Sequence, residues 1–385
     1  MKVLVISHSA IQPTYHRKFE EVARYGDIEI KIIVPEKWVE NTQELHFSQI
    51  DKGNLSFLSK KVAFAGYGSR FFFTESIIRE FKEFKPDIIH LEEEPWSLCA
   101  LQTIILRDLF CKKSKLIFRT SLSIPSKQRF NFIASNIEKL TFKKSDHAFV
   151  LSKRAGDILR KKSYNGDMSI GYNGVDASVF RKIDVRNLKN DLGIKDNECV
   201  IGYVGRLMKM KGIETLIRAF YTLLEQNPNK SYRLMLLGSG EYKEEMISIA
   251  SELGIKEKII LIEAVPALDV PRYINCMDVL VLPSLTMPWW VEFFGRVLVE
   301  AMMCEVPVIG SDSGEIPNVI GDAGLIFHEG DENDLKEKLD TIINNSYTRD
   351  LLITRGSARA SSMFTWESIA RETYKVYCSL LNLAK

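Results

Sequence analysis

The chain has 385 residues, of which 45% are hydrophobic and 26% charged, and its 52 Lys and Arg residues nearly balance 50 Asp and Glu residues. This length suggests about two domains, and the composition is that of an ordinary globular protein, not of a disordered, collagen-like or repeat protein. The most apolar stretch, 279–303, is interrupted by prolines and charges, so it does not predict a membrane-spanning helix.

Apolar runs alternate with helical patterns in the first half of the chain. We predict strands at 3–7, 28–34, 88–91, 116–119 and 147–151, and helices at 15–25, 73–84 and 95–110. Strands that alternate with helices favour a parallel sheet covered on both faces, in which ligands bind at the carboxyl ends of the strands.

The second half repeats this pattern. We predict strands at 199–204, 233–237, 258–262, 278–282 and 306–310, and helices at 212–226, 241–253, 268–275, 296–304 and 332–345, with a last helix at 367–381. The polar segment 173–194 carries Gly and Asp turn signals and is interpreted as the interdomain linker. The expected fold class is therefore α/β, with two Rossmann-like doubly wound domains facing a central cleft: 1–172, completed by helix 367–385, and 173–366.

Two glutamates flank the predicted start of a helix in 283–317. Glu292 lies in the loop after the strand that ends at Leu282, and Glu300 lies inside the helix, so both can face one elongated ligand. The first backbone N–H groups of this helix suit a phosphate. They belong to Phe294, Gly295, Arg296 and Val297. The Arg296 side chain either adds a phosphate contact or is a helix-surface cation.

A second motif follows the strand at 199–204. Gly205 at the strand end allows close approach of backbone to a ligand, and Arg206 and Lys211 are cations that can stabilise a leaving diphosphate. Lys209, between them, is interpreted as a solvated loop charge.

These two motifs together resemble the retaining nucleotide-sugar glycosyltransferases of family four, which have the GT-B fold. The shared pattern is PS…E-x-x-G-x-x-x-x-E-A-M with GRL…KG, and the NGVD at 173–176, the LGSG at 237–240 and the FTWE at 364–367 extend it. The resemblance implies that Glu292 contacts the donor sugar, that Glu300 holds the ribose hydroxyls and that Arg206 and Lys211 clamp the diphosphate. It also implies that Gly238 and Gly240 lie near the nucleotide.

The resemblance implies an activity as well. The family moves a sugar with retention at the anomeric carbon and without a required metal or cofactor, and this chain has no Asp-x-Asp metal motif. We expect transfer of a hexose-type sugar from a UDP- or GDP-sugar to a glycan or lipid-linked saccharide in cell-surface polysaccharide or glycolipid synthesis, and no nucleic-acid partner. The alternatives are a GT-B isomerase similar to the UDP-sugar 2-epimerases and a non-catalytic nucleotide-sugar-binding subunit.

Candidates for the acceptor side lie in the first half. His90, Glu92 and Glu94 end the strand at 88–91, where they could orient an acceptor hydroxyl; the alternative is a solvated acidic turn. Arg119 ends another strand, and His16 lies on the first predicted helix, where a surface histidine is the more common interpretation.

Charge and cysteine content bear on the location of the protein. Residues 1–175 hold 28 Lys and Arg against 20 Asp and Glu, and the remainder holds 24 against 30. The basic half either attracts an anionic partner such as phospholipid headgroups or reflects a chance surface bias. Segment 127–144 is either a membrane-surface helix or, more commonly, a core-packing helix with a basic outer face. Six scattered cysteines and a short apolar start that is typical of a core strand predict a cytoplasmic protein, either free or peripheral at the inner face of the membrane.

Overall fold

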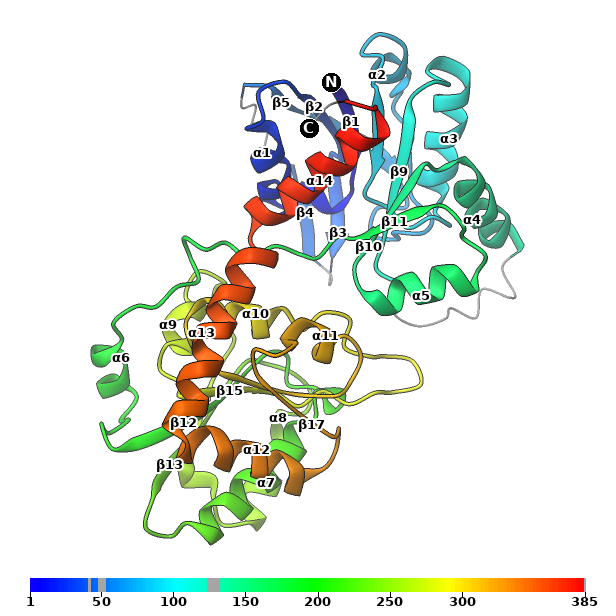
Figure 1. Ribbon diagram of the computed structural model, residues 1–385. Coiled ribbons are helices and arrows are strands. Elements are labelled where there is room, and N and C mark those ends of the chain that lie inside the picture. The colour runs from blue at the N-terminus through cyan, green and yellow to red at the C-terminus, as the bar shows by residue number, and fades with distance from the viewer. Residues whose placement is uncertain (41–42, 48–52, 123–131, 384–385) are drawn as a thin grey trace. The chain divides into compact units, whose positions relative to one another are not determined.

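The computed structural model describes residues 1–40, 43–47, 53–122 and 132–383. The chain divides into two compact units, which are described separately below (Figure 1). Unit 1 comprises Met1–Gly174 with Trp366–Lys385, and unit 2 comprises Val175–Thr365. Each unit is built on one parallel sheet, so the predicted α/β class with two Rossmann-like domains is confirmed.

Unit 1 has a seven-stranded sheet in the order β11-β10-β9-β8-β1-β2-β5, with every neighbouring pair parallel. Its strands are β1 Lys2–Ile6, β2 Glu29–Pro35, β5 Leu55–Lys60, β8 Ile88–Leu91, β9 Lys115–Thr120, β10 His147–Val150 and β11 Asp167–Ile170. The inner strands β1 and β8 are almost wholly buried because they are apolar on both faces, as a sheet covered on both sides requires. The strand order reverses beside β1, which is where such sheets bind ligands.

The helices of unit 1 cover this sheet. They are α1 Arg17–Ala23, α2 Ile78–Lys82, α3 Leu98–Phe110, α4 Phe132–Lys144, α5 Lys153–Lys161 and α14 Trp366–Leu380, with short 3₁₀ turns at Ser9–Ile11 and Pro13–Tyr15. Two hairpins, β3 Lys37–Glu40 with β4 Gln43–His46 and β6 Val62–Ala63 with β7 Phe72–Phe73, complete the unit. The final helix α14 packs against α1 (Figure 1). The rings of Tyr25 and Tyr374 stack beside this contact, with their centres 4.0 Å apart.

One predicted helix of unit 1 is largely wrong. The expected helix at 73–84 is confined to α2, and residues 72–73 form a strand instead. Thr74 donates its hydroxyl to Lys61 O at 3.2 Å, and Ser76 accepts from Ile78 N, so a bond to the preceding segment and one local side-chain bond take the place of the first helical turn.

Helix α4 packs into the core of unit 1. Ile137 and Thr141 are buried, as the core-packing interpretation requires, whereas Phe132 and Ile133 at its start are exposed. The earlier part of the candidate membrane helix, 127–131, lies outside the described residues.

Unit 2 has a six-stranded parallel sheet in the order β14-β13-β12-β15-β16-β17. Its strands are β12 Glu198–Val204, β13 Ser231–Leu237, β14 Ile259–Ile262, β15 Val279–Leu282, β16 Val308–Ser311 and β17 Leu325–Phe327. Its helices are α6 Arg186–Asp191, α7 Ile213–Gln226, α8 Lys243–Glu252, α9 Val270–Ile274, α10 Arg296–Met303, α11 Ile316–Ile320, α12 Glu332–Asn344 and α13 Ser346–Met363. The strand order reverses between β12 and β15, so the loops after these strands border the expected ligand site.

The segment interpreted as a linker, 173–194, contains α6 and is held to unit 2. Asn275 accepts from Ile183 N and donates to Arg181 O, each at 3.0 Å. The side chain of one buried asparagine thus fixes the first part of this segment on the unit.

Candidate active site

The loops after β12 and β13 approach each other backbone to backbone. Leu207 N donates to Ser239 O at 3.0 Å, and a Cβ placed on Gly238 would lie 1.9 Å from Gly205 O. At Gly240 an added Cβ would lie 2.2 Å from Leu207 O. Only glycine fits at these two positions, so the predicted glycines form a smooth, backbone-lined floor at the strand ends.

The turn that carries Lys211 packs closely against the loop after β15. Gly212 has φ +66°, and an added Cβ would lie 1.9 Å from Pro283 O. Leu285 N donates to Met210 O at 2.8 Å, which ties the two loops together. This contact brings Lys211 to Glu292, 81 residues later in the chain.

Hydrogen bonds fix both the side chain and the backbone of Glu292. Its carboxylate accepts from Lys211 Nζ at 2.6 Å and from Ser284 Oγ at 2.9 Å, and the residue is only 5% exposed. Its backbone oxygen accepts from Glu315 N at 2.9 Å. The carboxylate therefore has one fixed position, which is what a group that orients a sugar hydroxyl needs.

An aromatic ring covers the cation of this pair. Lys211 Nζ lies 4.6 Å from the centre of the Trp290 ring, within the range of a cation–π contact. The neighbouring Trp289 is 71% exposed. From the sequence, Ser284 was included only as part of the PS motif, with no contact assigned to it. Trp290 was not singled out, although the Pro-Trp-Trp run beside Glu292 was a visible signal.

Helix α10 begins beside the same loop. Gly295, at its N-cap, has φ +73° and offers no capping side chain, and Phe294 before it is buried. The first N–H groups of the helix thus have no side-chain cap, which suits an anionic ligand.

Glu300 lies one turn inside α10. Arg296 Nε lies 2.9 Å from Glu300 Oε1, and burial raises the pKa of this carboxyl while Arg296 opposes that rise. Arg296 itself is exposed, and in this state it partners Glu300.

The remaining cation of the predicted clamp is open to solvent. Arg206 is exposed, and its guanidinium makes no ion pair with any residue in the described ranges. Across the glycine floor, Ser239 donates to Glu263 at 2.8 Å, and Lys243 forms an ion pair with Glu263 that lowers the pKa of its carboxyl. Over the described residues no cluster of three or more His, Cys, Asp or Glu side chains could hold a metal ion.

A second polar cluster lies at the strand ends of unit 1, and it includes three of the predicted acceptor-side residues. Glu92 accepts from Lys18 Nζ at 2.5 Å, and its carboxylate lies 3.0 Å from His90 Nε2 and 3.6 Å from Arg119. Tyr377 of α14 lies 2.5 Å from His90 Nδ1. A small cavity of about 20 Å³ borders Glu92, Lys18 and Arg119.

Burial and charge set the protonation states in this cluster. Burial, with Lys18 nearby, lowers the pKa of His90 to about 4, so the imidazole is neutral near pH 7. The charges of Lys18 and Arg119 outweigh burial at Glu92 and hold its pKa well below the usual range. The result is a fixed carboxylate beside a neutral histidine.

Two predicted acceptor-side residues lie apart from this cluster. His16 is buried before the start of α1, and its Nε2 lies 2.6 Å from Ala10 O, so the interpretation as a surface histidine is wrong. Glu94 accepts from Thr120 Oγ1 at 2.5 Å and from Ser121. The alternative of a solvated acidic turn is also wrong, because all three carboxylates at 92–94 bond to neighbouring residues.

The sequence reasoning missed the pair formed by His8 and Glu93. The His8 imidazole lies 2.7 Å from the Glu93 carboxylate, which also accepts from His8 N at 2.6 Å. Glu93 raises the pKa of His8 despite burial, and the ring packs on Trp38 at 4.5 Å. The available signal was a histidine directly after the first predicted strand, 3–7.

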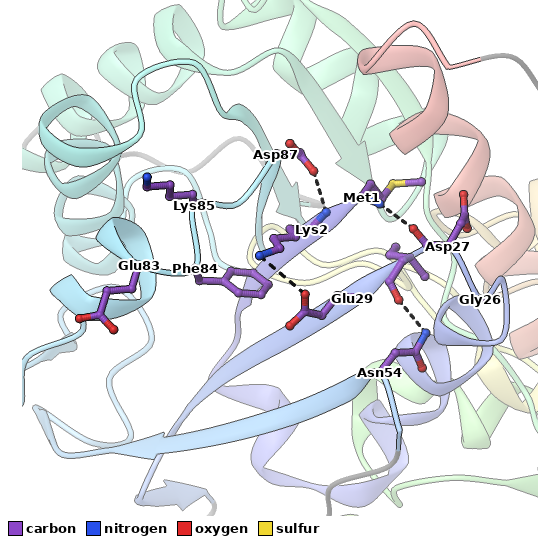
Figure 2. A pocket seen from close by; sticks show the side chains of 11 residues that line it. Met1, Lys2, Gly26, Asp27, Glu29, Asn54, Glu83, Phe84, Lys85 and Asp87 are labelled. Atoms are coloured by element: carbon purple, nitrogen blue, oxygen red, sulfur yellow. Dashed lines mark hydrogen bonds and ion pairs between the residues drawn. The ribbon is translucent and has the colours of Figure 1, made fainter.

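An open hollow of about 660 Å³ lies at the opposite edge of the unit 1 sheet (Figure 2). It is bordered by the amino ends of β1, β2 and β8, and its polar groups bond to one another: Lys2 N donates to Asp87 at 2.7 Å, and Asn54 donates to Ile28 O. It faces away from the carboxyl ends of the strands, so it is not the candidate site.

Residues 184–359 match the family described as glycosyl transferases group 1. The chain is 28% identical over 215 residues to the uncharacterized glycosyltransferase MJ1607 of Methanocaldococcus jannaschii, covering 54% of this chain and 52% of that protein. It is 31% identical over 219 residues to the capsular polysaccharide biosynthesis glycosyltransferase CapM of Staphylococcus aureus, covering 55% of each. The chain thus spans about half the length of the curated relatives it matches.

The fold also matches solved structures over nearly the whole chain. HepE of Anabaena in complex with UDP superposes with a TM-score of 0.73 at 17% identity, over 98% of this chain and 100% of that one. At this identity the likeness shows the fold, which is GT-B. The match to the glycosyl transferases group 1 family at 184–359 takes in every site loop of unit 2, so the candidate site lies within the part of the chain that is similar to this family.

Proposed function

We propose that the protein is a retaining glycosyltransferase that moves a hexose-type sugar from a UDP- or GDP-sugar to a glycan or a lipid-linked saccharide, in cell-surface polysaccharide or glycolipid synthesis. The observation that carries this proposal is the Lys211–Glu292 pair at the switch point of the unit 2 sheet. A cation and a buried carboxylate lie side by side there, which suits the diphosphate and the sugar of a single donor.

Each part of the donor has a fitting partner in unit 2. The uncapped start of α10 with Arg206 and Lys211 suits the diphosphate, and Glu292 suits the hydroxyls of the sugar. Glu300 suits the ribose, because Arg296 can release it to accept two hydroxyl bonds.

The reaction we propose needs no metal. The leaving diphosphate is stabilised by Lys211, Arg206 and the helix start, and one of its oxygens takes the proton of the acceptor hydroxyl as the new bond forms on the same face of the sugar. The acceptor hydroxyl would be oriented by the cluster around Glu92 in unit 1.

We further propose that the enzyme works in the cytoplasm as a peripheral protein on the inner membrane face, where a lipid-linked acceptor would be presented. No helix in the described ranges is both long and apolar enough to span a bilayer. The excess of cations in unit 1, 31 Lys and Arg against 22 Asp and Glu for a formal charge of +9, supports attraction to an anionic membrane.

The test is to measure thermal stability with UDP, GDP and ADP and then to assay the sugar donors of the nucleotide that binds. A nucleotide that binds the folded state raises Tm by mass action. We expect a rise with UDP or GDP, followed by release of the same nucleotide when donor and a lipid-linked saccharide are both present. No rise with any of the three, together with no donor turnover, would overturn the proposal.

A further inference from the structure

Helix α3 of unit 1 is apolar on its outer face as well as on its inner face. Cys99, Ala100 and Ile104 pack into the core beneath it. On the other side Ile105 is 48% and Leu109 is 69% exposed. Apolar side chains exposed on both turns of the outer face mark a surface that can bind a partner or a membrane.

The hairpin of β6 and β7 extends this apolar surface. Gln102 of α3 accepts from Phe73 N and donates to Phe73 O, each at 2.9 Å, so the hairpin is fixed to the helix. An apolar hollow of about 320 Å³ lies between Phe72 and α3. At the hairpin tip Phe64 is 57% and Tyr67 is 62% exposed.

Cations border this surface, and the neighbouring carboxylates are engaged. Within segments 61–83 and 98–113 every exposed carboxylate forms an ion pair: Glu75 with Lys60, Glu83 with Arg79 and Asp108 with Lys144. The cations Lys61, Arg70, Lys112 and Lys113 of the same segments are exposed and form no ion pair with a described residue. The border of the apolar surface is therefore positive.

We propose that α3 and the β6–β7 hairpin dock the protein on an anionic lipid bilayer, with Ile105, Leu109, Phe64 and Tyr67 at headgroup depth and Lys112 and Lys113 on the phosphates. Exposed aliphatic and aromatic side chains flanked by lysines are the chemistry that an anionic bilayer surface binds. A second copy of the chain fits less well, because pairing through this face would oppose two positive borders. This inference rests on the membrane contact in the proposed function and assigns it a surface.

The test is cosedimentation of the full chain with vesicles of phosphatidylcholine alone or with about one third phosphatidylglycerol. The paired substitutions are I105S/L109S and K112A/K113A, all at exposed positions, so the fold should survive. The matched controls lie in unit 2: L268S, at a leucine 74% exposed, and K256A/K258A, at two exposed lysines.

We expect wild-type protein to bind the anionic vesicles. K112A/K113A should lower that affinity about 10- to 30-fold at low salt, since each lysine near an anionic surface contributes severalfold. I105S/L109S should lower it at every salt concentration, and the controls should bind as wild type does.

Three results would overturn the proposal: no binding of the wild type to anionic vesicles, equal losses in the controls, or a dimer in light scattering that I105S/L109S dissociates. The nucleotide-induced rise in Tm, measured in the same variants, keeps the two proposals apart. It should be unchanged by the surface substitutions, and its absence in the wild type would count against the donor site alone.

Discussion

Glu292 and Lys211 neutralise each other at 2.6 Å, so a diphosphate that binds Lys211 has to compete with a carboxylate of the same protein. In the proposed reaction Lys211 turns to the phosphate, and Glu292, which still accepts from Ser284, then has room for a sugar hydroxyl. Under this proposal, binding of the diphosphate by Lys211 favours binding of the sugar by Glu292.

Glu292→Gln should separate these two roles. Transfer should fall at least about 100-fold, because a neutral amide replaces a fixed charge at the reacting sugar. The affinity for the nucleoside diphosphate should rise a fewfold, because Lys211 no longer leaves an ion pair to bind it. Single-turnover transfer and calorimetric titration measure the two effects, and Glu337→Gln, on the exposed face of α12, is the control. Near-normal transfer, or a tenfold loss of nucleotide affinity, would contradict this coupling.

Gly212 can be tested against a glycine of the same backbone conformation. Gly212 and Gly254 have φ +66° and +69°, but an added Cβ meets Pro283 O at 1.9 Å in the first and no atom within 4 Å in the second. Gly254→Ala should cost about 1 kcal/mol of unfolding free energy from backbone strain alone. Gly212→Ala should cost clearly more and weaken nucleotide binding, because the loop of Lys211 must shift. Equal losses in urea denaturation would show that the close approach to Pro283 does not matter.

At the residue scale the sequence identified the charged groups better than their partners. Glu292, Lys211 and the glycines followed from spacing and from the resemblance. The contact between Lys211 and Glu292 joins positions 81 residues apart, and the pairs of Lys18 with Glu92 and of His8 with Glu93 join positions 74 and 85 residues apart. No local pattern predicts such pairs, because tertiary packing creates them.

Helix α10 carries the proposed ribose contact on Glu300. If the carboxylate binds the ribose hydroxyls, the wild type should bind a 2′,3′-dideoxy nucleoside diphosphate about tenfold or more weakly than the normal nucleotide. Glu300→Ala should weaken the normal nucleotide to the same level and discriminate little between the two. Titration of both ligands into both proteins gives the coupling energy. If Glu300→Ala still bound the dideoxy nucleotide as much more weakly than the normal nucleotide as the wild type does, Glu300 would not contact the ribose hydroxyls.

Strand β8 and helix α14 meet at His90 and Tyr377, and this contact predicts how unit 1 responds to acid. The folded pKa of His90 is about 4, against about 6.5 in an unfolded chain. Between these values the unfolded chain binds a proton that the folded chain does not. The stability contribution is therefore complete above pH 6.5 and is lost as the pH falls toward 4, by at most about 3 kcal/mol.

Urea denaturation between pH 7 and pH 4.5 measures this effect. The lowered pKa of Glu92 acts in the same direction at lower pH. His90→Gln should be less stable at pH 7 and should lose less on acidification, whereas His46→Gln, at an exposed histidine, should follow the wild type. If the free energy of unfolding of His90→Gln fell with pH as steeply as that of the wild type, the acid response would belong to other groups.

At the element scale the buried strands were predicted best. Strands β1, β8, β10, β12 and β15 are mostly apolar and buried, and all were expected within a few residues. The edge strands β5 and β11 and the 18-residue α13 were missed. Their residues are mixed in polarity because one side faces solvent, so the apolar periodicity is weak.

Over the whole molecule the predicted α/β class is right because the alternation of strands and helices persists along the chain. The formal charge is divided, +9 in unit 1 and, with 21 Lys and Arg against 28 Asp and Glu, −7 in unit 2. If this acidic unit binds an anionic donor, as proposed, it must concentrate cations locally. Substituting the two lysines of the Lys209–Lys211 turn one at a time therefore tests which of them binds the donor.

Calorimetric titration of UDP and GDP into the wild type, Lys211→Ala and Lys209→Ala tests the donor site most directly. Both lysines lie in the same turn, but Lys209 is exposed while Lys211 contacts Glu292 and Trp290. We predict that one nucleotide binds the wild type, that Lys211→Ala weakens it about 30-fold or more, and that Lys209→Ala binds as the wild type does. Equal affinities in all three proteins, or binding of neither nucleotide, would contradict the account.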